Sequence, residues 1–426
     1  MKRFAKVLVA VGCAVSISSL ALGQKAFNLV KVPNSNPDSA TAINNAGQVI
    51  VNAGTPESYT VSLWNLQGGP QALDLTGGNN VGVAIDAGND VAGAGDPDDS
   101  GNLKAFLWQE GGGVQWLGTL GGPVSTATGV NAGREVVGMS LNAADVPHAF
   151  LWSETGGMQD LTPSLTGSLG AIATGINTSG EAVGYYYPNG AANVVGFSWT
   201  QAGGLASFGA PGTMALAIND AGTTAGEELT ASGARHAFSM QPGGEMVDLG
   251  TLGGDQSSAV AINNKGWIVG TSLTNDQSGV LHGFLWTPSG GMQDFTALSA
   301  LGQEAEPYSI QINDSGDIAV SMRTQLVLLV PHMTATATSA PNPSVAGQPV
   351  TITATVNSIA GPPPDGETLQ FFVGGLPAGT GTFSKGVAKV TVSGLNSGTH
   401  AVAVSYAGDT NYLPFRYTVF KQVVNP

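Results

Sequence analysis

Histidine and aspartate recur at fixed places in a stretch that the sequence repeats, HAFLWSETGGMQDL at 148–161 and HGFLWTPSGGMQDF at 282–295. The histidines of this stretch are His148, His236 and His282, and the recurring aspartates are Asp74, Asp160, Asp248 and Asp294. A histidine beside a nucleophile acts as a general base in many enzymes. A catalytic group is needed once, however, whereas a packing residue is needed in every copy of a repeat. We therefore expect these histidines to pack in the core and these aspartates to form turn or strand-edge hydrogen bonds.

The remaining sequence contains few residues that could act in nucleophilic catalysis. Only His332 and His400 lie outside the repeated place, and no G-x-S-x-G, H-E-x-x-H or phosphate-binding glycine loop occurs. Five tryptophans recur like the histidines and carry the same packing expectation: Trp64, Trp108, Trp152, Trp199 and Trp286. We expect no catalytic residue and no cofactor.

Acidic side chains leave one enzymatic interpretation open. Paired carboxylates cleave glycosidic bonds, and a repeat fold assembles such pairs from distant units. The glutamates that could contribute are Glu135, Glu154, Glu181, Glu227, Glu228 and Glu245. We favour solvated loop charges for them, and keep an enzyme acting on extracellular polysaccharide, a glycoside hydrolase or lyase, as the alternative function.

The loop GDPDDSGN at 95–102 resembles the opening of a calcium loop. Its oxygen-bearing residues at alternate positions are Asp96, Asp98 and Ser100. A calcium loop of this kind has a bidentate glutamate at its twelfth position, where this chain has Leu107, and its ninth position holds Lys104. We therefore expect no metal at this loop.

The elements that must position these residues are repeated seven times. Each unit is marked by an apolar anchor at the end of its first strand, followed by an asparagine or aspartate, a short glycine turn and an apolar strand. The anchors are Ile43, Ile85, Val130, Ile176, Ile218, Ile262 and Ile312, which number units 1 to 7. Hairpin turns typically contain an asparagine whose side chain bonds its own backbone and a glycine of positive φ. In units 2 and 3 the glycines, Gly88 and Gly133, come one residue early, which predicts a different turn type there.

A period of about 45 residues suits four short strands, and such units are typical of a β-propeller. We expect an all-β chain with a seven-bladed β-propeller at 24–331. The seventh unit stops at Pro331 after three strands, while 26–32 is a strand without a unit. We expect 26–32 to pair with 325–330 and so close the ring.

A second domain of different composition follows, and it is rich in threonine and proline. Strands are expected at 335–340, 349–357, 368–374, 379–384, 386–393, 399–406 and 415–423. This spacing predicts an Ig-like β-sandwich at 332–426. Its core would be Val350, Ile352, Leu369, Phe371, Val390, Val402 and Val404.

Both parts resemble known families. The combination AIN-N-x-G-x-VVG, HAFLW and GGM-x-DLGTLGG resembles the probable extracellular repeat of the HAF family, with departures at 201–209 and 323–331. SYAGDTNY at 405–412 resembles the third group of bacterial Ig-like domains. The first resemblance implies export and a β-rich repeat fold, but no activity; the second implies a spacer or adhesive module of surface proteins.

The first 23 residues have the pattern of a secretory signal peptide, with basic residues, an apolar run and a small-x-small site before Gln24. Their removal takes three of the 14 Lys and Arg and leaves 11 against 29 Asp and Glu, a net charge of −18. Nucleic acid is therefore excluded as a partner, and no membrane span is expected in the mature chain. The mature chain would hold no cysteine, since Cys13 lies in this segment. We expect a bacterial protein that is secreted or held at the cell surface, with the periplasm as a further location.

Variation between the units predicts where the protein binds. The loops between the second and third strands differ in every unit, and unit 4 carries three tyrosines there, GYYYPNG at 184–190. Variable loops on a rigid scaffold are typical of a recognition surface. We expect a binding or interaction protein whose ligand-binding residues are Tyr186 and Tyr187, with an extracellular glycan or protein as partner.

Overall fold

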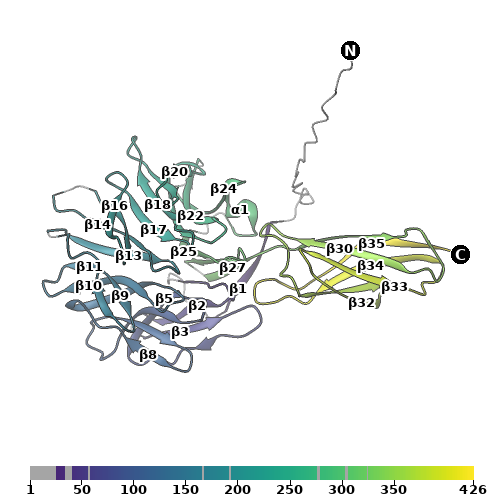
Figure 1. Ribbon diagram of the computed structural model, residues 1–426, viewed down its shortest axis with the longest axis horizontal. Helices are drawn as coiled ribbons and strands as arrows, with labels where there is room; N and C mark the ends of the chain where they lie inside the picture. The colour runs from purple at the N-terminus through teal and green to yellow at the C-terminus, as the bar shows by residue number, and fades with distance from the viewer. Residues whose placement is uncertain are drawn as a thin grey trace, which may run out of the picture.

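The computed structural model describes residues 25–33, 41–55, 58–165, 167–190, 193–275, 279–302, 306–323 and 325–426. The expected signal peptide at 1–23 lies outside the described residues. Within the described part, the chain is almost entirely β-structure, in sheets like the blades of a propeller followed by an Ig-like sandwich (Figure 1).

The described residues from 27 to 331 form seven antiparallel sheets, one for each sequence unit. Unit 1 supplies β2 (Val49–Thr55), β3 (Ser58–Trp64) and β4 (Gln71–Ala72), with Ile43 bridged to Val49. Unit 2 supplies β5 (Gly78–Ile85), β6 (Val91–Asp96), β7 (Lys104–Gln109) and β8 (Gly113–Trp116). Unit 3 supplies β9 (Gly121–Val130), β10 (Val136–Asn142), β11 (Pro147–Ser153) and β12 (Gly157–Asp160).

The later units repeat the same order of strands. Unit 4 supplies β13 (Gly170–Ile176), β14 (Ala182–Tyr187), β15 (Val195–Thr200) and β16 (Gly204–Phe208). Unit 5 supplies β17 (Met214–Ile218), β18 (Thr224–Leu229), β19 (Arg235–Met240) and β20 (Met246–Asp248). Unit 6 supplies β21 (Gly253–Ile262), β22 (Ile268–Thr274), β23 (Leu281–Thr287) and β24 (Gly291–Asp294), followed by the short helix α1 (Phe295–Leu298). Unit 7 supplies β25 (Pro307–Ile312), β26 (Ile318–Met322) and β27 (Gln325–Pro331).

The N-terminal strand completes unit 7, as the sequence predicts. β1 (Phe27–Val32) pairs antiparallel with β27, from Phe27 opposite Pro331 to Val32 opposite Leu326. Phe27 and Val32 are buried in the apolar clusters on the two sides of this sheet. The expected closure of the seventh unit is therefore confirmed.

Packing explains why the strand-two segment V-V-G ends in glycine. In unit 3, a Cβ atom added to Gly138 would lie 2.0 Å from the carbonyl oxygen of Thr126 and 2.9 Å from the ring of Phe150. Glycines in four other units meet the same two neighbours: Gly93, Gly184, Gly226 and Gly270. The phenylalanines that fill this space are fully buried: Phe106, Phe150, Phe197, Phe238 and Phe284. The G of VVG and the F of HAF are therefore one packing unit.

The turn after the anchor has one geometry in all seven units. In unit 1 the side-chain oxygen of Asn44 accepts from the backbone N–H of Ala46 and Gln48, at 3.1 and 3.0 Å, and Gly47 has a φ of 72°. Units 2 and 3 place Asn89 and Arg134 at the same position, with φ of 69° and 61°. The different turn type expected there is therefore wrong, because a non-glycine residue takes the left-handed position instead.

These turns also link the units. The Nδ2 of Asn44 donates to the carbonyl oxygen of Asp86 in the next unit, at 2.9 Å. Equivalent bonds run from Asn131 to Asn177, from Asn177 to Asn219, from Asn219 to Asn263, from Asn263 to Asn313, and from Asn313 back to Asn44. Only Asp86, which has no side-chain donor, leaves a step of this circuit unfilled. The anchor asparagines therefore hold both their own turn and the next unit.

The C-terminal part is a sandwich of two sheets. One contains β28 (Thr334–Ala340), β30 (Val350–Asn357) and β33 (Val387–Val392). The other contains β29 (Ser344–Val345), β31 (Thr368–Val373), β32 (Leu376–Thr382), β34 (Gly398–Tyr406) and β35 (Phe415–Asn425). Six of the seven predicted core residues are buried, and Val390 is half-buried against them. The expected strands are confirmed, with the two-residue β29 in addition.

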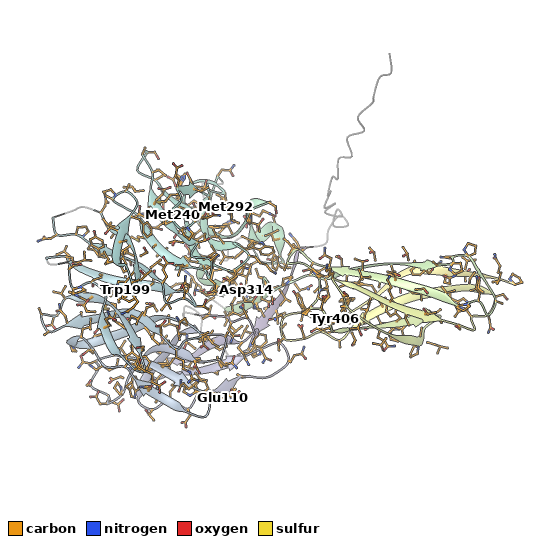
Figure 2. All side chains as sticks on the ribbon, viewed as in Figure 1. Glu110, Trp199, Met240, Met292, Asp314 and Tyr406 are labelled. Atoms are coloured by element: carbon orange, nitrogen blue, oxygen red, sulfur yellow. The ribbon has the colours of Figure 1, made fainter. Side chains whose placement is uncertain are left out.

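The sandwich docks on one end of the propeller. We call this end, which carries the asparagine turns, the turn end, and the opposite end, with the loops between strands two and three, the loop end. Asn411 donates to the carbonyl oxygen of Asn45 at 3.3 Å, and Lys265 donates to that of Ala360 at 2.9 Å. Figure 2 shows Asp314, in the unit 7 turn, on the side of the propeller toward the sandwich. These contacts leave the loop end free of the sandwich.

Among the described residues, no helix is of a length and apolarity that would cross a membrane.

Candidate binding site

The recurring histidines and aspartates bind each other. The Nδ1 of His148 lies 2.8 Å from Oδ2 of Asp160, and the same pair recurs as His236 with Asp248 at 2.9 Å and His282 with Asp294 at 2.8 Å. The other carboxylate oxygen of each aspartate accepts a backbone N–H two residues on, from Thr162, Gly250 and Thr296. The turn hydrogen bonds expected of these three aspartates are therefore confirmed, and His282 is buried as expected, whereas His148 and His236 are half-buried.

Asp74 does not belong to this set. Leu161, next to Asp160, donates its N–H to Ala149, and the equivalent bond in unit 1 runs from Leu73 to Val61. Ala72 therefore stands at the aspartate position, and Asp74 lies two residues beyond it. The tryptophans fit the packing expectation better: four are buried, and Trp286 is half-buried against the cluster between units 5 and 6.

The glutamates considered for catalysis do not converge. Glu135 receives a bond from Asn131 at the turn end, whereas Glu227 and Glu228 lie near the loop end on β18. Glu154 and Glu245 are exposed. Within the described residues, no group of three or more His, Cys, Asp or Glu is arranged to hold a metal ion.

A shallow pocket of about 160 Å³ lies at the turn end between units 1, 4, 5, 6 and 7. Two carboxylates line it, Asp220 and Asp314, but the Nδ2 of Asn264 stands between them and donates to both, at 2.8 and 3.0 Å. Burial raises the pKa of Asp220, but hydrogen bonds from Thr178 and Asn264 outweigh it and leave that pKa lowered. A glycosidase acid needs a raised pKa and room for the sugar. This carboxylate pair therefore ties adjacent turns together and is poorly suited to catalysis.

The first aspartate of the loop at 95–102 forms hydrogen bonds within the loop itself. Asp96 is buried, and its two carboxylate oxygens accept from the backbone N–H of Ser100 and Gly101, at 3.0 and 2.6 Å. A hydrogen bond from Ser100 lowers the pKa of the exposed Asp98. The resemblance to a calcium loop thus arises from residues that fold the loop on itself.

The two tyrosines expected to bind a ligand point to opposite sides of their strand. Tyr186 packs against the cluster between units 3 and 4, and its hydroxyl lies 3.2 Å from Oγ of Ser207. Tyr187 is 45% exposed and meets the ring of Tyr185 edge to face, with centroids 5.9 Å apart. The aromatic pair on this side of the strand is therefore the half-buried Tyr185 with the exposed Tyr187. Strand alternation, which places residues two apart on one face, carries the signal for this pair.

Further side chains extend this aromatic pair. Leu169 is 68% exposed and its N–H donates to the carbonyl oxygen of Tyr187 at 2.8 Å. Burial raises the pKa of Tyr185, with smaller contributions from Tyr187 and Glu227. The phenol of Tyr185 is thus neutral. We call Leu169, Tyr185 and Tyr187 the loop-end cluster.

Comparison with known families identifies one part of the chain. Residues 337–425 match the bacterial Ig-like domain (group 3). The match covers the sandwich strands from β28 to β35, and the predicted resemblance of this part is confirmed. No curated protein matches the chain in sequence.

Solved structures resemble the chain at low sequence identity. A streptogramin B lyase is 15% identical, covers 72% of this chain and 98% of its own, and has a TM-score of 0.47. Virginiamycin B lyase from Staphylococcus aureus is also 15% identical, covers 71% of this chain and 98% of its own, and has a TM-score of 0.48. The extracellular domain of a one-component system from B. thetaiotaomicron is 8% identical, with 95% of this chain and 57% of that chain covered and a TM-score of 0.42. At these values the comparisons carry no argument about activity.

Proposed function

We propose that this chain is an exported bacterial binding protein whose propeller recognises an extracellular partner at its loop end, with a glycan as the first candidate. The observation that carries the proposal is the exposed pair Leu169 and Tyr187 at the loop end, backed by Tyr185. Exposed apolar side chains gathered at one place are typical of interaction sites. A tyrosine ring also offers a flat apolar face with a polar edge, which suits a sugar.

The way the sandwich is attached supports this end as the recognition surface. The sandwich contacts the turn end, through Asn411 and Lys265, and leaves the loop end open to a partner. Net charge limits the kind of partner: the chain carries a formal charge of −15, which repels acidic polymers. A neutral or basic partner fits this charge.

The proposal includes the finer organisation of the chain. Residues 1–23 are a signal peptide, 24–331 a seven-bladed propeller of HAF-type repeats and 332–426 an Ig-like domain that displays it at the cell surface, in the periplasm or in the medium. Bacterial Ig-like domains, matched here at 337–425, agree with such a location. The alternative of a polysaccharide enzyme finds no support in the turn-end pocket, where Asn264 separates the two carboxylates.

A glycan array tests the proposal. The purified mature chain is applied to the array, and bound glycans are analysed for cleavage products in the same samples. The expected result is binding without cleavage that Tyr187→Ala weakens by at least about 1 kcal/mol. Tyr308→Ala is the matched control, because Tyr308 is 63% exposed but lies in unit 7. Equal binding by all three proteins contradicts the proposed surface, and cleavage products favour the enzyme.

A further inference from the structure

His148 is bonded through both of its ring nitrogens. Its Nδ1 lies 2.8 Å from Oδ2 of Asp160, and its Nε2 lies 3.1 Å from Nδ2 of Asn142, at the end of β10. The Oδ1 of Asn142 accepts from the backbone N–H of Ala144 and Val146, at 2.8 and 3.2 Å, which fixes the direction in which the amide points. Its NH2 group therefore faces the ring, and because an amide NH2 only donates, the Nε2 of His148 accepts.

These hydrogen bonds define the protonation state of His148. Because Nε2 accepts from Asn142, the ring proton lies on Nδ1 and is donated to Asp160, so the ring is neutral. A second proton would be added at Nε2, where it would face the NH2 group of Asn142. The bond to Asn142 would then be lost, whereas the bond to Asp160 would remain and be strengthened by the charge. Histidine ordinarily takes up this proton at about pH 6.5, close to neutral pH.

Few other charges lie on the elements around His148. Strands β9, β10 and β13 contain no charged residue. Asp160 lies on β12, Asp145 is exposed in the loop after β10, and the Lys104 ammonium of unit 2 donates to a carbonyl oxygen on β9. Of these groups, Asp160 bonds the ring at Nδ1, so Asn142 is the group that a proton on Nε2 would meet.

Asn142 also shapes the loop at 142–146, which connects β10 to β11 at the loop end. Its backbone N–H donates to the carbonyl oxygen of Val146 at 3.0 Å, and its own carbonyl oxygen accepts from Asp145 at 2.9 Å. Asp145 has a φ of 59°, a conformation that these bonds must hold in a residue other than glycine. Loss of the bond to His148 would therefore free the side chain around which this loop is folded.

Pro147 carries this loop to the loop-end cluster of unit 4. A Cβ atom added to Gly170 would lie 3.3–3.4 Å from three atoms of the Pro147 ring, so the proline lies against the Gly170 backbone. Gly170 pairs with Tyr187 across β13 and β14, and the preceding Leu169 donates its N–H to the carbonyl oxygen of Tyr187 at 2.8 Å. A shift of the loop at 142–146 would therefore act on the residues proposed to bind the partner.

We propose that His148 and Asn142 form a pH-sensitive switch that holds the loop end in its binding form at neutral pH and releases it in acid. This regulation rests on the proposed function, because it acts on the same site. The ordered loop requires a neutral ring and so holds one proton fewer than the released loop, and a higher pH favours the ordered loop. Binding should weaken by about three- to tenfold from about pH 7.5 to about pH 5.5, as expected for the loss of one hydrogen bond.

Hydrogen exchange tests the switch without any ligand. Exchange of the segment 143–147 is measured by mass spectrometry in the full mature chain at about pH 7.5 and about pH 5.5, and is corrected for the intrinsic effect of pH. The corrected rate should rise by about three- to tenfold in acid, because the N–H groups of Ala144 and Val146 are then held less firmly by Asn142. Hydroxyl-radical oxidation of Pro147 should rise as well, relative to Tyr308 of unit 7.

Two variants separate the switch from a general effect of acid. Asn142→Asp keeps the oxygen that accepts from the loop N–H groups but places a carboxylate oxygen opposite Nε2 of His148, where it accepts from the protonated ring. His148→Gln supplies an amide oxygen that accepts from Asn142 at any pH. Both should abolish the rise in exchange. Asn102→Asp is the matched control, because it adds the same charge to the loop end in unit 2, where the Asn102 amide bonds Ser100. This control should respond to pH like the unmodified chain.

Each outcome decides a separate point. The glycan array is repeated at both pH values, and acid should weaken binding of the unmodified chain but not of Asn142→Asp. Equal corrected exchange at both pH values, or the same rise in both variants, overturns the switch and leaves the proposed function standing. Faster exchange without weaker glycan binding in acid overturns the regulation of binding. An array without any bound glycan overturns the proposed function, while exchange of 143–147 still decides the switch. Both variants are checked by thermal unfolding, so one that folds is enough to decide.

Discussion

The side chain of Asn313 donates a hydrogen bond to the backbone oxygen of Asn44, 269 residues earlier in the chain, at 3.1 Å. This bond joins the last sequence unit to the first. The same bond links four further pairs of consecutive anchor asparagines and joins Asn44 to Asp86. The asparagine of each AIN motif is therefore required by its neighbour as well as by its own turn.

Two opposite substitutions test this circuit. Asn263→Asp keeps the oxygen that accepts from Lys265 and Trp267 but removes the donor to Asn313. The carbonyl oxygen of Asn313 would then keep its bond from the N–H of Gly316 but lose the one from Asn263, and the loss of this buried hydrogen bond should lower the free energy of unfolding by about 0.5–1.5 kcal/mol. Asp86→Asn should restore the missing donor toward Asn131 and leave stability unchanged or raise it by about 1 kcal/mol. Urea unfolding of both variants measures this, and an equal effect of the two would argue against the circuit.

The closing strand gives a second prediction. Deleting residues 24–34 removes β1 and exposes the edge of β27, so we expect the melting temperature to fall by several degrees or more, as roughly follows from a loss of a few kcal/mol. Phe27→Ala, at a buried position, should lower it as well, whereas Lys31→Ala, at an exposed position of the same strand, should not. A melting curve unchanged by the deletion would show that β1 adds nothing to the ring.

The third prediction concerns the close packing of Gly270 against Phe284. A Cβ on Gly270 would lie 1.9 Å from the carbonyl oxygen of Ser258 and 2.9 Å from the ring of Phe284. Gly270→Ala should therefore destabilise the protein by about 1–3 kcal/mol or more, through overpacking. Gly69→Ala is the control, because nothing lies within 4 Å of the added atom there. Calorimetry of the two variants compares them, and a tolerated alanine at Gly270 would mean that the strands separate more easily than this packing implies.

Asp317 gives a prediction about pH. Its side chain is fully buried, Oδ2 accepts from Asn313 at 3.0 Å, and Oδ1 has no hydrogen-bond partner in the described structure. Burial raises the pKa of Asp317 well above its ordinary value of 3.8; the Asn313 bond opposes this, nearby Asp409 adds to it, and Lys265 opposes it. A raised folded-state pKa means that the stabilising contribution is complete below 3.8 and is lost as pH rises through the folded value.

The measurement is the free energy of unfolding of the chain and of Asp317→Asn, from about pH 4 to about pH 8. The unmodified chain should lose stability relative to the variant as pH rises. A constant difference between the two across this range would show that Asp317 does not titrate there.

Local sequence spacing predicts most of this fold, and the features that it does not predict have physical causes. The anchors, the V-V-G segments and the unpaired strand at 26–32 predict the units and their closure, because each signal lies within a few residues. The left-handed Asn89 and Arg134 escaped prediction, because their turns follow the bonding of the preceding Asp86 and Asn131 side chains more than the place of glycine. Contacts between units cannot be predicted in this way, because a bond such as that from Asn44 to Asp86 depends on how adjacent sheets stack.

At the binding site, too, local sequence spacing does not predict which of the three consecutive tyrosines face solvent. The sequence marks GYYYPNG correctly as a departure from the repeat, but its tyrosines lie on strand β14 and Tyr186 turns inward to Ser207. Replacing Tyr186 and Tyr187 together should therefore lower the melting temperature, so binding is better tested with Tyr187 alone.

The claim that a partner binds the loop end at unit 4 is tested most directly by hydroxyl-radical footprinting of the mature chain, with and without the glycan that the array selects. Tyr187 and Tyr308 are both exposed tyrosines on different units, so they report on the same chemistry at two places. The account predicts that the glycan protects Tyr187 and Leu169 from oxidation while Tyr308 reacts as before. Protection confined to the turn end, or to Tyr308, would contradict it.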